Sequence, residues 1–269
     1  GGAEEFAIDR YGNEVAPMPV KLRETRLQAL KGKDALYDSG MGLFLSKGDH
    51  TLTLRCAEGA FSVTRIAFVA CQETPGDASA AIAGDQAITI EAERAARRNS
   101  ANIRASSLYN TALTPYSTDG KRMNYIEDGS WKYAGDTLEF DFEVAREGWY
   151  GLSFRCRQTD KTDYAVFRTA MIDGAIPSAA FDAFAVPSTD GFVNYVVRDA
   201  DGNAAAVYLT AGKHTLSLAV TVAPLREEIT ALRRIADEMA AFALEVSKIT
   251  GGNTDTYRDF DELPAAVLR

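Results

Sequence analysis

The segment Val207-Tyr-Leu-Thr-Ala-Gly-Lys-His-Thr-Leu-Ser-Leu218 repeats an earlier one, Leu43-Phe-Leu-Ser-Lys-Gly-Asp-His-Thr-Leu-Thr-Leu54. In each copy, apolar and polar residues alternate on both sides of a glycine turn, which is the pattern of a β-hairpin. The two copies lie too far apart in the chain for the short repeats of a solenoid. The repeat therefore predicts two related β modules in tandem.

Residues 88–222 predict a complete antiparallel β-sandwich of jelly-roll type. Alternation with period two marks strands outside the repeat at 88–93, 137–144, 148–156, 164–172 and 192–197. The short turn at 145–148 predicts that the strands on either side of it pair as a meander.

Residues 1–74 offer only about four strands, including Phe61–Phe68, where a sandwich needs about seven. They predict the C-terminal half of a first β-sandwich module. A linker rich in Pro, Gly, Ala and Ser follows at 75–87.

Residues 223–269 predict a long amphipathic helix and the start of a following domain. Apolar residues recur every three or four positions from Leu225 to Ile249, after Pro224 and before Gly251-Gly252. Such a stripe packs either on the sandwich or on a domain beyond residue 269.

The composition excludes several classes of partner. The chain has 269 residues, a net charge of −9 and no cluster of basic residues, which argues against nucleic acid. No apolar run reaches the ~18 residues of a membrane span. Cys56, Cys71 and Cys156 are too few and scattered for a disulfide scaffold; buried free thiols and a single Cys56–Cys71 disulfide are the alternatives.

The sequence predicts that this segment is not an enzyme. The only histidines, His50 and His214, occupy the same slot of the repeat, which favours a structural role beside a turn. No nucleophile-elbow, zinc-protease, P-loop or dinucleotide motif is present. Acidic pairs such as Asp141 and Glu143 simply share a strand face.

Two groups of residues could bind a ligand. Glu91 and Glu93 share one face of the predicted strand at 88–93 and could supply oxygen ligands to a structural Ca²⁺; the alternative is a solvated strand face. Aromatic residues in loop-like sequence, with polar neighbours, suit sugar stacking. The predicted sugar-binding residues are Tyr116, Arg122, Asn124, Tyr125 and Trp131; Tyr109 and Tyr133 lie in the same stretch. The alternative for Trp131 and Trp149 is a place in the sandwich core, which is expected more of Trp149 than of Trp131.

The second module resembles carbohydrate-binding modules of families 6 and 35. The resemblance lies in Ile88–Glu93, in Gly129-Ser-Trp131 and in Phe140–Phe154. It implies a galactose-binding-like jelly-roll β-sandwich, with Glu91 and Glu93 in the strand that contributes to a calcium site. The closing strand of those modules carries an acidic calcium ligand, and here a helix after Pro224 stands in its place.

A second resemblance covers nearly the whole chain. Ile8–Val15, the two Gly-x-His-Thr-Leu hairpins, Val166–Gly174 and Ile249-Thr-Gly-Gly-Asn-Thr-Asp-Thr-Tyr-Arg-Asp-Phe260 resemble large solute-binding proteins of carbohydrate ABC transporters from gut-type Gram-positive bacteria. It implies an extracellular, lipid-anchored surface protein of which this is a middle segment, with a transporter permease as the partner of the absent domains.

Three functions follow as hypotheses. The leading one is a glycan-binding or spacer segment of a surface solute-binding lipoprotein. The second is an accessory region of a large extracellular glycoside hydrolase. The third is a structural module that contacts other proteins through its helix.

Overall fold

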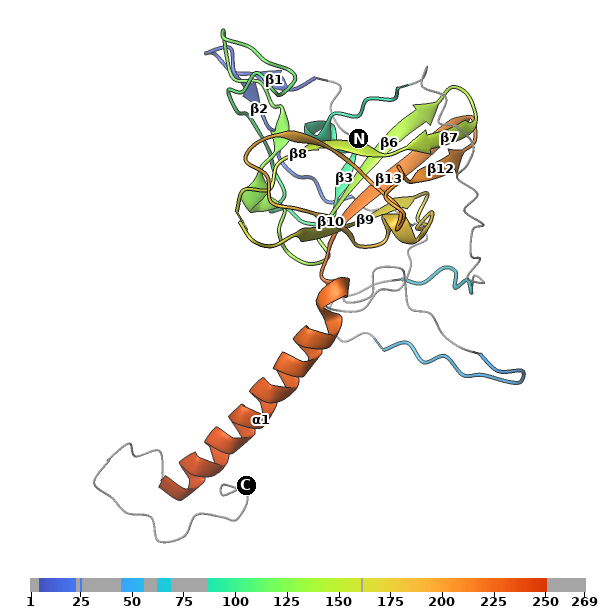
Figure 1. The fold of residues 1–269 in the computed structure, drawn as a ribbon, viewed down its shortest axis with the longest axis vertical. Helices are drawn as coiled ribbons and strands as arrows, with labels where there is room; N and C mark the ends of the chain where they lie inside the picture. Colours follow the sequence, from blue (N-terminus) through green and yellow to red (C-terminus); the bar gives the residue numbers. More distant parts are fainter. Residues whose placement is uncertain are drawn as a thin grey trace. The chain divides into compact units, whose positions relative to one another are not determined.

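A computed structural model describes residues 5–22, 25, 45–55, 62–68, 87–160 and 162–250 of the chain. The chain divides into two units, Gly1–Ala223 and Pro224–Arg269, each described here by itself. The first contains a β-sandwich and the second a long helix (Figure 1). The chain is therefore mainly β, as its sequence predicts.

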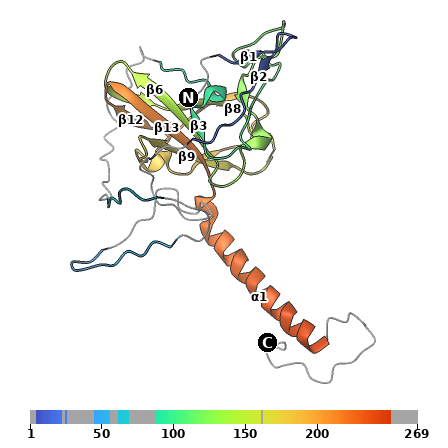
Figure 2. The same ribbon diagram turned by 180° about the vertical axis from the view of Figure 1, so that it is seen from behind.

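The larger layer of the sandwich is an antiparallel sheet with the strand order β10-β9-β13-β6-β3. The bounds of these strands are, in that order, Phe184–Val186, Val166–Ile172, Gly212–Thr221, Thr137–Val144 and Arg97–Arg98. β13 is the longest and lies between β9 and β6, so that Leu216 faces Ile172 on one side and Phe140 on the other. Both views of the ribbon show these three strands side by side (Figures 1 and 2).

The second layer is built from β7, β8, β11 and β12. Their bounds are Gly148–Gly151, Ser153–Cys156, Val193–Val196 and Ala206–Leu209. β7 and β8 are one stretch of chain interrupted at Leu152, whose carbonyl accepts a hydrogen bond from Val197. β12 pairs with β7 and β11 with β8, both antiparallel.

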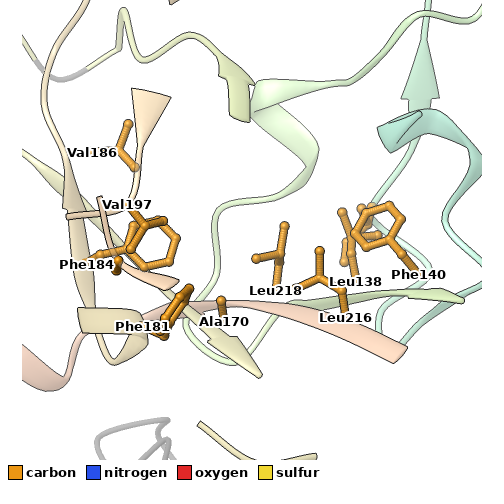
Figure 3. Close-up of a cluster of buried hydrophobic side chains, with 11 residues drawn as sticks. Leu138, Phe140, Ala170, Phe181, Phe184, Val186, Val197, Leu216 and Leu218 are labelled. Carbon is orange, nitrogen blue, oxygen red and sulfur yellow. The ribbon is translucent and has the colours of Figure 1, made fainter. Parts of the chain in front are cut away.

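The core lies between the two layers. In β6, Leu138, Phe140 and Val144 are buried while Asp141 and Glu143 are exposed, as the period-two pattern of 137–144 predicts. Figure 3 shows the cluster of buried apolar side chains to which both layers contribute, including Leu138, Phe140, Ala170, Phe181, Phe184, Val197, Leu216 and Leu218. The apolar area that this cluster removes from water is the main source of the sandwich's stability.

Two predicted hairpins are instead crossovers between the layers. β6 and β7 are joined by the turn at 145–147, yet β6 pairs with β13 and β7 pairs with β12. β12 and β13, the two halves of the later repeat copy, likewise pair with strands of different layers. The predictions of a meander at 145–148 and of a paired hairpin at 207–218 are wrong for this reason, although the strands themselves are confirmed.

The strands predicted at 88–93 and in the first repeat copy are not found in the described residues. The one at 88–93 is wrong, because residues 87–91 are irregular and Ala92–Arg94 form a 3₁₀ helix. In the first copy, residues 45–55 and 62–68 contain no assigned strand, and most of the remaining predicted module lies outside the described residues. The partial first module and its boundary at 74 therefore stay predictions.

The two repeated histidines make the same contact. The His214 Nε2 atom lies 2.9 Å from the carbonyl oxygen of Thr210, and the His50 Nε2 atom lies 2.7 Å from that of Ser46, each four residues earlier. His214 also bonds through Nδ1 to the Asp173 carboxylate at 2.7 Å, and this bond raises the pKa of His214. In both copies the histidine contacts the backbone on the other side of the turn, which supports a structural role for this position.

The helix α1 spans Arg226–Thr250 and is preceded by a 3₁₀ turn at Ala223–Leu225. Its apolar stripe is exposed at Leu232, Met239 and Phe242. The predicted helix is thus confirmed. In the part of the chain that the structure describes, no helix is both long and apolar enough to cross a membrane.

Cys156 is a free thiol at the edge of the core. Burial raises the pKa of this thiol, which keeps it protonated and unreactive. Cys56 and Cys71 lie outside the described residues, so their redox state stays a prediction.

Candidate functional site

A long loop between β4 (Ala105–Ser106) and β5 (Tyr125–Ile126) forms the candidate site. Asn124 holds this loop in shape. Its Oδ1 accepts a hydrogen bond from the Leu108 N–H at 3.0 Å, and its Nδ2 donates to the carbonyls of Leu108 and Pro115. Both polar atoms of the side chain are engaged in these hydrogen bonds, and only 7% of Asn124 is exposed. Asn124 therefore shapes the loop from beneath.

The loop encloses a shallow hollow on the surface. Its walls are formed by Ser107, Leu108, Tyr109, Pro115, Tyr116, Ser117, Lys121, Arg122 and Asn124. Tyr109 is 60% exposed and Tyr116 is 47% exposed. Exposed aromatic rings beside hydrogen-bonding groups suit the apolar faces and the hydroxyls of a sugar.

An N-terminal strand pair, β1 (Ala7–Ile8) and β2 (Glu14–Val15), docks onto this loop. The Lys121 N–H donates to Asn13 Oδ1 at 3.0 Å, and the Met123 N–H donates to Glu14 Oε2 at 2.7 Å. The Arg122 Nη1 donates to the Gly12 carbonyl at 2.8 Å. A stretch more than a hundred residues away in sequence thus supports the loop that lines the hollow.

The local chemistry of residues 9–13 explains the turn between β1 and β2. The Asp9 carboxylate accepts hydrogen bonds from the backbone N–H groups of Tyr11 and Asn13. These hydrogen bonds lower the pKa of Asp9, and the bond from the Asn13 N–H contributes most. Gly12 adopts a φ of 80°, which glycine tolerates best.

At Gly120 the loop lies close against the backbone of the strand pair. A Cβ atom at Gly120 would lie 2.4 Å from the carbonyl oxygen of Gly12. We expect Gly120→Ala to detach residues 6–15 from the loop, because backbone atoms on both sides cannot move aside separately. Hydrogen exchange of residues 6–15 should rise, whereas Gly129→Ala, where a Cβ meets nothing within 4 Å, should leave it unchanged. Equal exchange in both variants would contradict this docking.

The hollow unites three of the five predicted sugar-binding residues. Tyr116, Arg122 and Asn124 line it, but Asn124 serves the loop itself. Tyr125 lies edge-on against Phe192, with ring centroids 6.4 Å apart. Trp131 packs against the core, its Nε1 donates to the Asp136 carbonyl, and it does not line the hollow, so its part in sugar binding stays a prediction.

Sequence reasoning missed two contributions to the hollow. Lys121 lies in a polar stretch without a pattern, and the docking of β1 and β2 is a contact that no local signal announces. Trp149, which was expected in the core, instead lies half-buried on the outer side of β7, edge-on to Tyr208 at 5.6 Å between ring centroids.

Glu93 is the unusual member of the predicted calcium pair. It is only 7% exposed, and its Oε1 atom has no hydrogen-bond partner within the described residues. Burial raises the pKa of Glu93 to about 7, and the nearby charges of Glu91 and Glu14 add to the rise. A buried carboxylate oxygen without a partner would accept a cation, so this residue fits a calcium ligand.

The wider donor set fits a metal less well. Among the described residues, no group of three or more His, Cys, Asp or Glu side chains could hold a metal ion. Calcium at Glu91 and Glu93 would need backbone carbonyls or water to complete its coordination. The calcium site stays a prediction.

The comparisons with known proteins give remote structural likenesses. No family model and no curated protein matches the chain. The solved structure of the cycloisomaltooligosaccharide glucanotransferase of Paenibacillus sp., complexed with cycloisomaltoheptaose, is similar over 49% of this chain and 16% of its own, with 21% identity and a TM-score of 0.31. The GH26-CBM35 β-(1,4)-mannanase of Podospora anserina is similar over 50% and 24%, with 18% identity and a TM-score of 0.33.

The chain thus spans less than a quarter of the length of each of these two enzymes. With TM-scores below 0.5, neither likeness assigns a function to this chain. The fold assignment rests on the strand pairing described above, which defines a jelly-roll β-sandwich.

Proposed function

We propose that residues 88–222 are a non-catalytic glycan-binding module and that the hollow around Tyr109 and Tyr116 is its binding site. The observation that carries this proposal is the pair of exposed tyrosine rings beside Lys121 and Arg122, on a loop that Asn124 fixes in place. A fixed loop loses little conformational entropy when a ligand binds, which favours recognition by so shallow a surface.

The wider setting of this module follows from the sequence resemblance. The motifs at 8–15 and 249–260 support a segment of a cell-surface solute-binding lipoprotein that holds glycan near a carbohydrate ABC transporter, whose permease would contact the absent domains. The same hollow would serve an accessory region of an extracellular glycoside hydrolase. The flanking gene sequence separates the two: a two-lobed binding domain after residue 269 supports the first, and a catalytic barrel or propeller supports the second.

Tyr116→Ala tests the proposed site. Loss of one stacking ring should weaken binding about two- to twelvefold, because an aromatic contact contributes about 0.5–1.5 kcal/mol. Isothermal titration against a glycan panel, with and without Ca²⁺, measures this change.

Two variants serve as controls for Tyr116→Ala. Tyr164→Ala removes a ring that is 74% exposed and lies outside the hollow, so its affinity should equal that of the wild type. Trp149→Ala breaks the aromatic pair that Trp149 of β7 forms with Tyr208 of β12. If Trp149→Ala abolishes binding and Tyr116→Ala does not, the site lies on the sheet; if no glycan binds at all, the spacer function remains.

A further inference from the structure

The charge of the hollow indicates which glycans it would bind. Its nine lining residues include two cations, Lys121 and Arg122, and no carboxylate. This contrasts with the chain as a whole, whose net charge is −9. A basic hollow on an acidic protein attracts anionic ligands to one place and repels them elsewhere.

The cations of the hollow are not engaged in ion pairs within the described residues. Salt bridges there include those of Arg97, Arg104 and Arg157 with acids, and none involves Lys121 or Arg122. The charge of Lys121 does reach the Asp9 carboxylate, where it contributes to lowering the pKa of Asp9. The hydrogen bonds of Arg122 go to the carbonyls of Gly12 and Lys121, and both come from Nη1. The rest of the guanidinium fork is thus available to a ligand.

The docked N-terminal strand pair holds this guanidinium in place. The Gly12 carbonyl accepts the Nη1 hydrogen bond at 2.8 Å. Asn13 and Glu14 fix the backbone of the neighbouring residues through the Lys121 and Met123 N–H groups. Two bonds to Nη1 restrict the rotation of a long side chain and so reduce the entropy lost when it binds an anion.

From this geometry we propose that the hollow binds a glycan carrying a negative charge, with a sugar ring against Tyr116 or Tyr109 and the anionic group on Arg122. The planar fork of arginine matches a carboxylate in a bidentate pair, which favours a uronic acid over a sulfated sugar. Residues 12–14 act as positioning residues for Arg122. This inference rests on the proposed function of the hollow.

The test compares matched ligands on the whole chain: an oligogalacturonate, its methyl ester, which blocks the charge at constant shape, and a sulfated galactan oligosaccharide. We expect the acid to bind at least about tenfold more tightly than the ester, since a charge-assisted hydrogen bond contributes about 1.5–3 kcal/mol. The preference should shrink as the salt concentration rises. Tighter binding of the sulfated ligand would keep the anionic site but overturn the choice of carboxylate.

Variants separate recognition from positioning. Arg122→Gln should weaken binding of the acid about tenfold or more and change the affinity for the ester by less than about threefold. Glu14→Ala should weaken the acid severalfold at an unchanged melting temperature of the sandwich, and Glu14→Gln, which keeps the acceptor for Met123, should restore it.

The outcomes distinguish the inference from the function on which it rests. Equal binding of acid and ester in the wild type, with Tyr116→Ala still harmful, overturns the anionic specificity and leaves the glycan site intact. Absence of binding by all three ligands and by the neutral panel overturns both. Loss of acid binding in Arg122→Gln but no effect of Glu14→Ala overturns the positioning role of residues 12–14.

Discussion

Asn124→Ala is expected to destabilise the sandwich by about 2–3 kcal/mol and to abolish ligand binding at the hollow. The substitution removes three hydrogen bonds from a side chain that is 7% exposed and leaves the Leu108 N–H and two carbonyls without their partners. Each partly buried group left unsatisfied costs about 1 kcal/mol, and less where water reaches it. Urea unfolding gives the stability change, and titration with the best glycan of the panel gives the change in affinity.

Two further variants sharpen this expectation. Asn124→Asp keeps the acceptor for Leu108 but sets a carboxylate against the carbonyls of Leu108 and Pro115, so it should be as harmful as alanine at neutral pH. Asn102→Ala removes an exposed amide from the surface and should change stability by less than about 0.5 kcal/mol. A wild-type affinity in Asn124→Ala would show that the loop does not depend on this residue.

Glu93→Gln should remove a pH dependence from the stability of the chain. Burial first, and then the charges of Glu91 and Glu14, raise the pKa of Glu93 to about 7. In calcium-free buffer, the folded protein keeps a proton at Glu93 that the unfolded chain releases near the ordinary glutamate pKa of 4.5. Stability should therefore fall as the pH rises from about 4.5 to about 7, by about 1–3 kcal/mol after allowance for residual solvation.

The stability of Glu93→Gln should not show this decrease with pH, because its amide is neutral at every pH, as the protonated carboxylic acid is. Urea unfolding at pH 5 and pH 8 measures the difference. Calcium provides the second arm: if Glu91 and Glu93 bind Ca²⁺, the ion should stabilise the wild type at pH 8 and not Glu93→Gln. The same pH profile in both proteins would contradict the raised pKa of Glu93.

The sequence predicts the elements of this fold better than their partners. The alternation in Thr137–Val144 identifies β6 to the residue, since period two follows directly from strand geometry. The same alternation does not specify which strand lies beside β6. A short turn such as 145–147 can join two strands that pair with each other in a hairpin, or two strands that lie in different layers of a sandwich. Only long-range packing decides which of these two arrangements forms.

The candidate site shows the same division. Tyr116 and Arg122 could be picked out as residue types suited to sugars, and the structure places both in one hollow. Asn124 and Trp131 have equally suitable chemistry. However, the Asn124 amide is hydrogen-bonded to carbonyls of the loop, and Trp131 packs against the core. The contribution of Gly12 and Glu14 depends on a tertiary contact, which the sequence of neither stretch encodes by itself.

The connection between β13 and α1 has a mechanical consequence. A pull on the helix reaches the sandwich through β13, since only the turn at Ala223–Leu225 separates the helix from this strand. β13 is hydrogen-bonded to β6 over residues 212–219 and to β9 over residues 216–221. These bonds run across the strand, so a force along β13 loads both ladders in shear and must break many bonds at once. The chain thus leaves the sandwich from its longest strand, which is paired on both sides and would resist such a force better than a strand at the edge of the sheet.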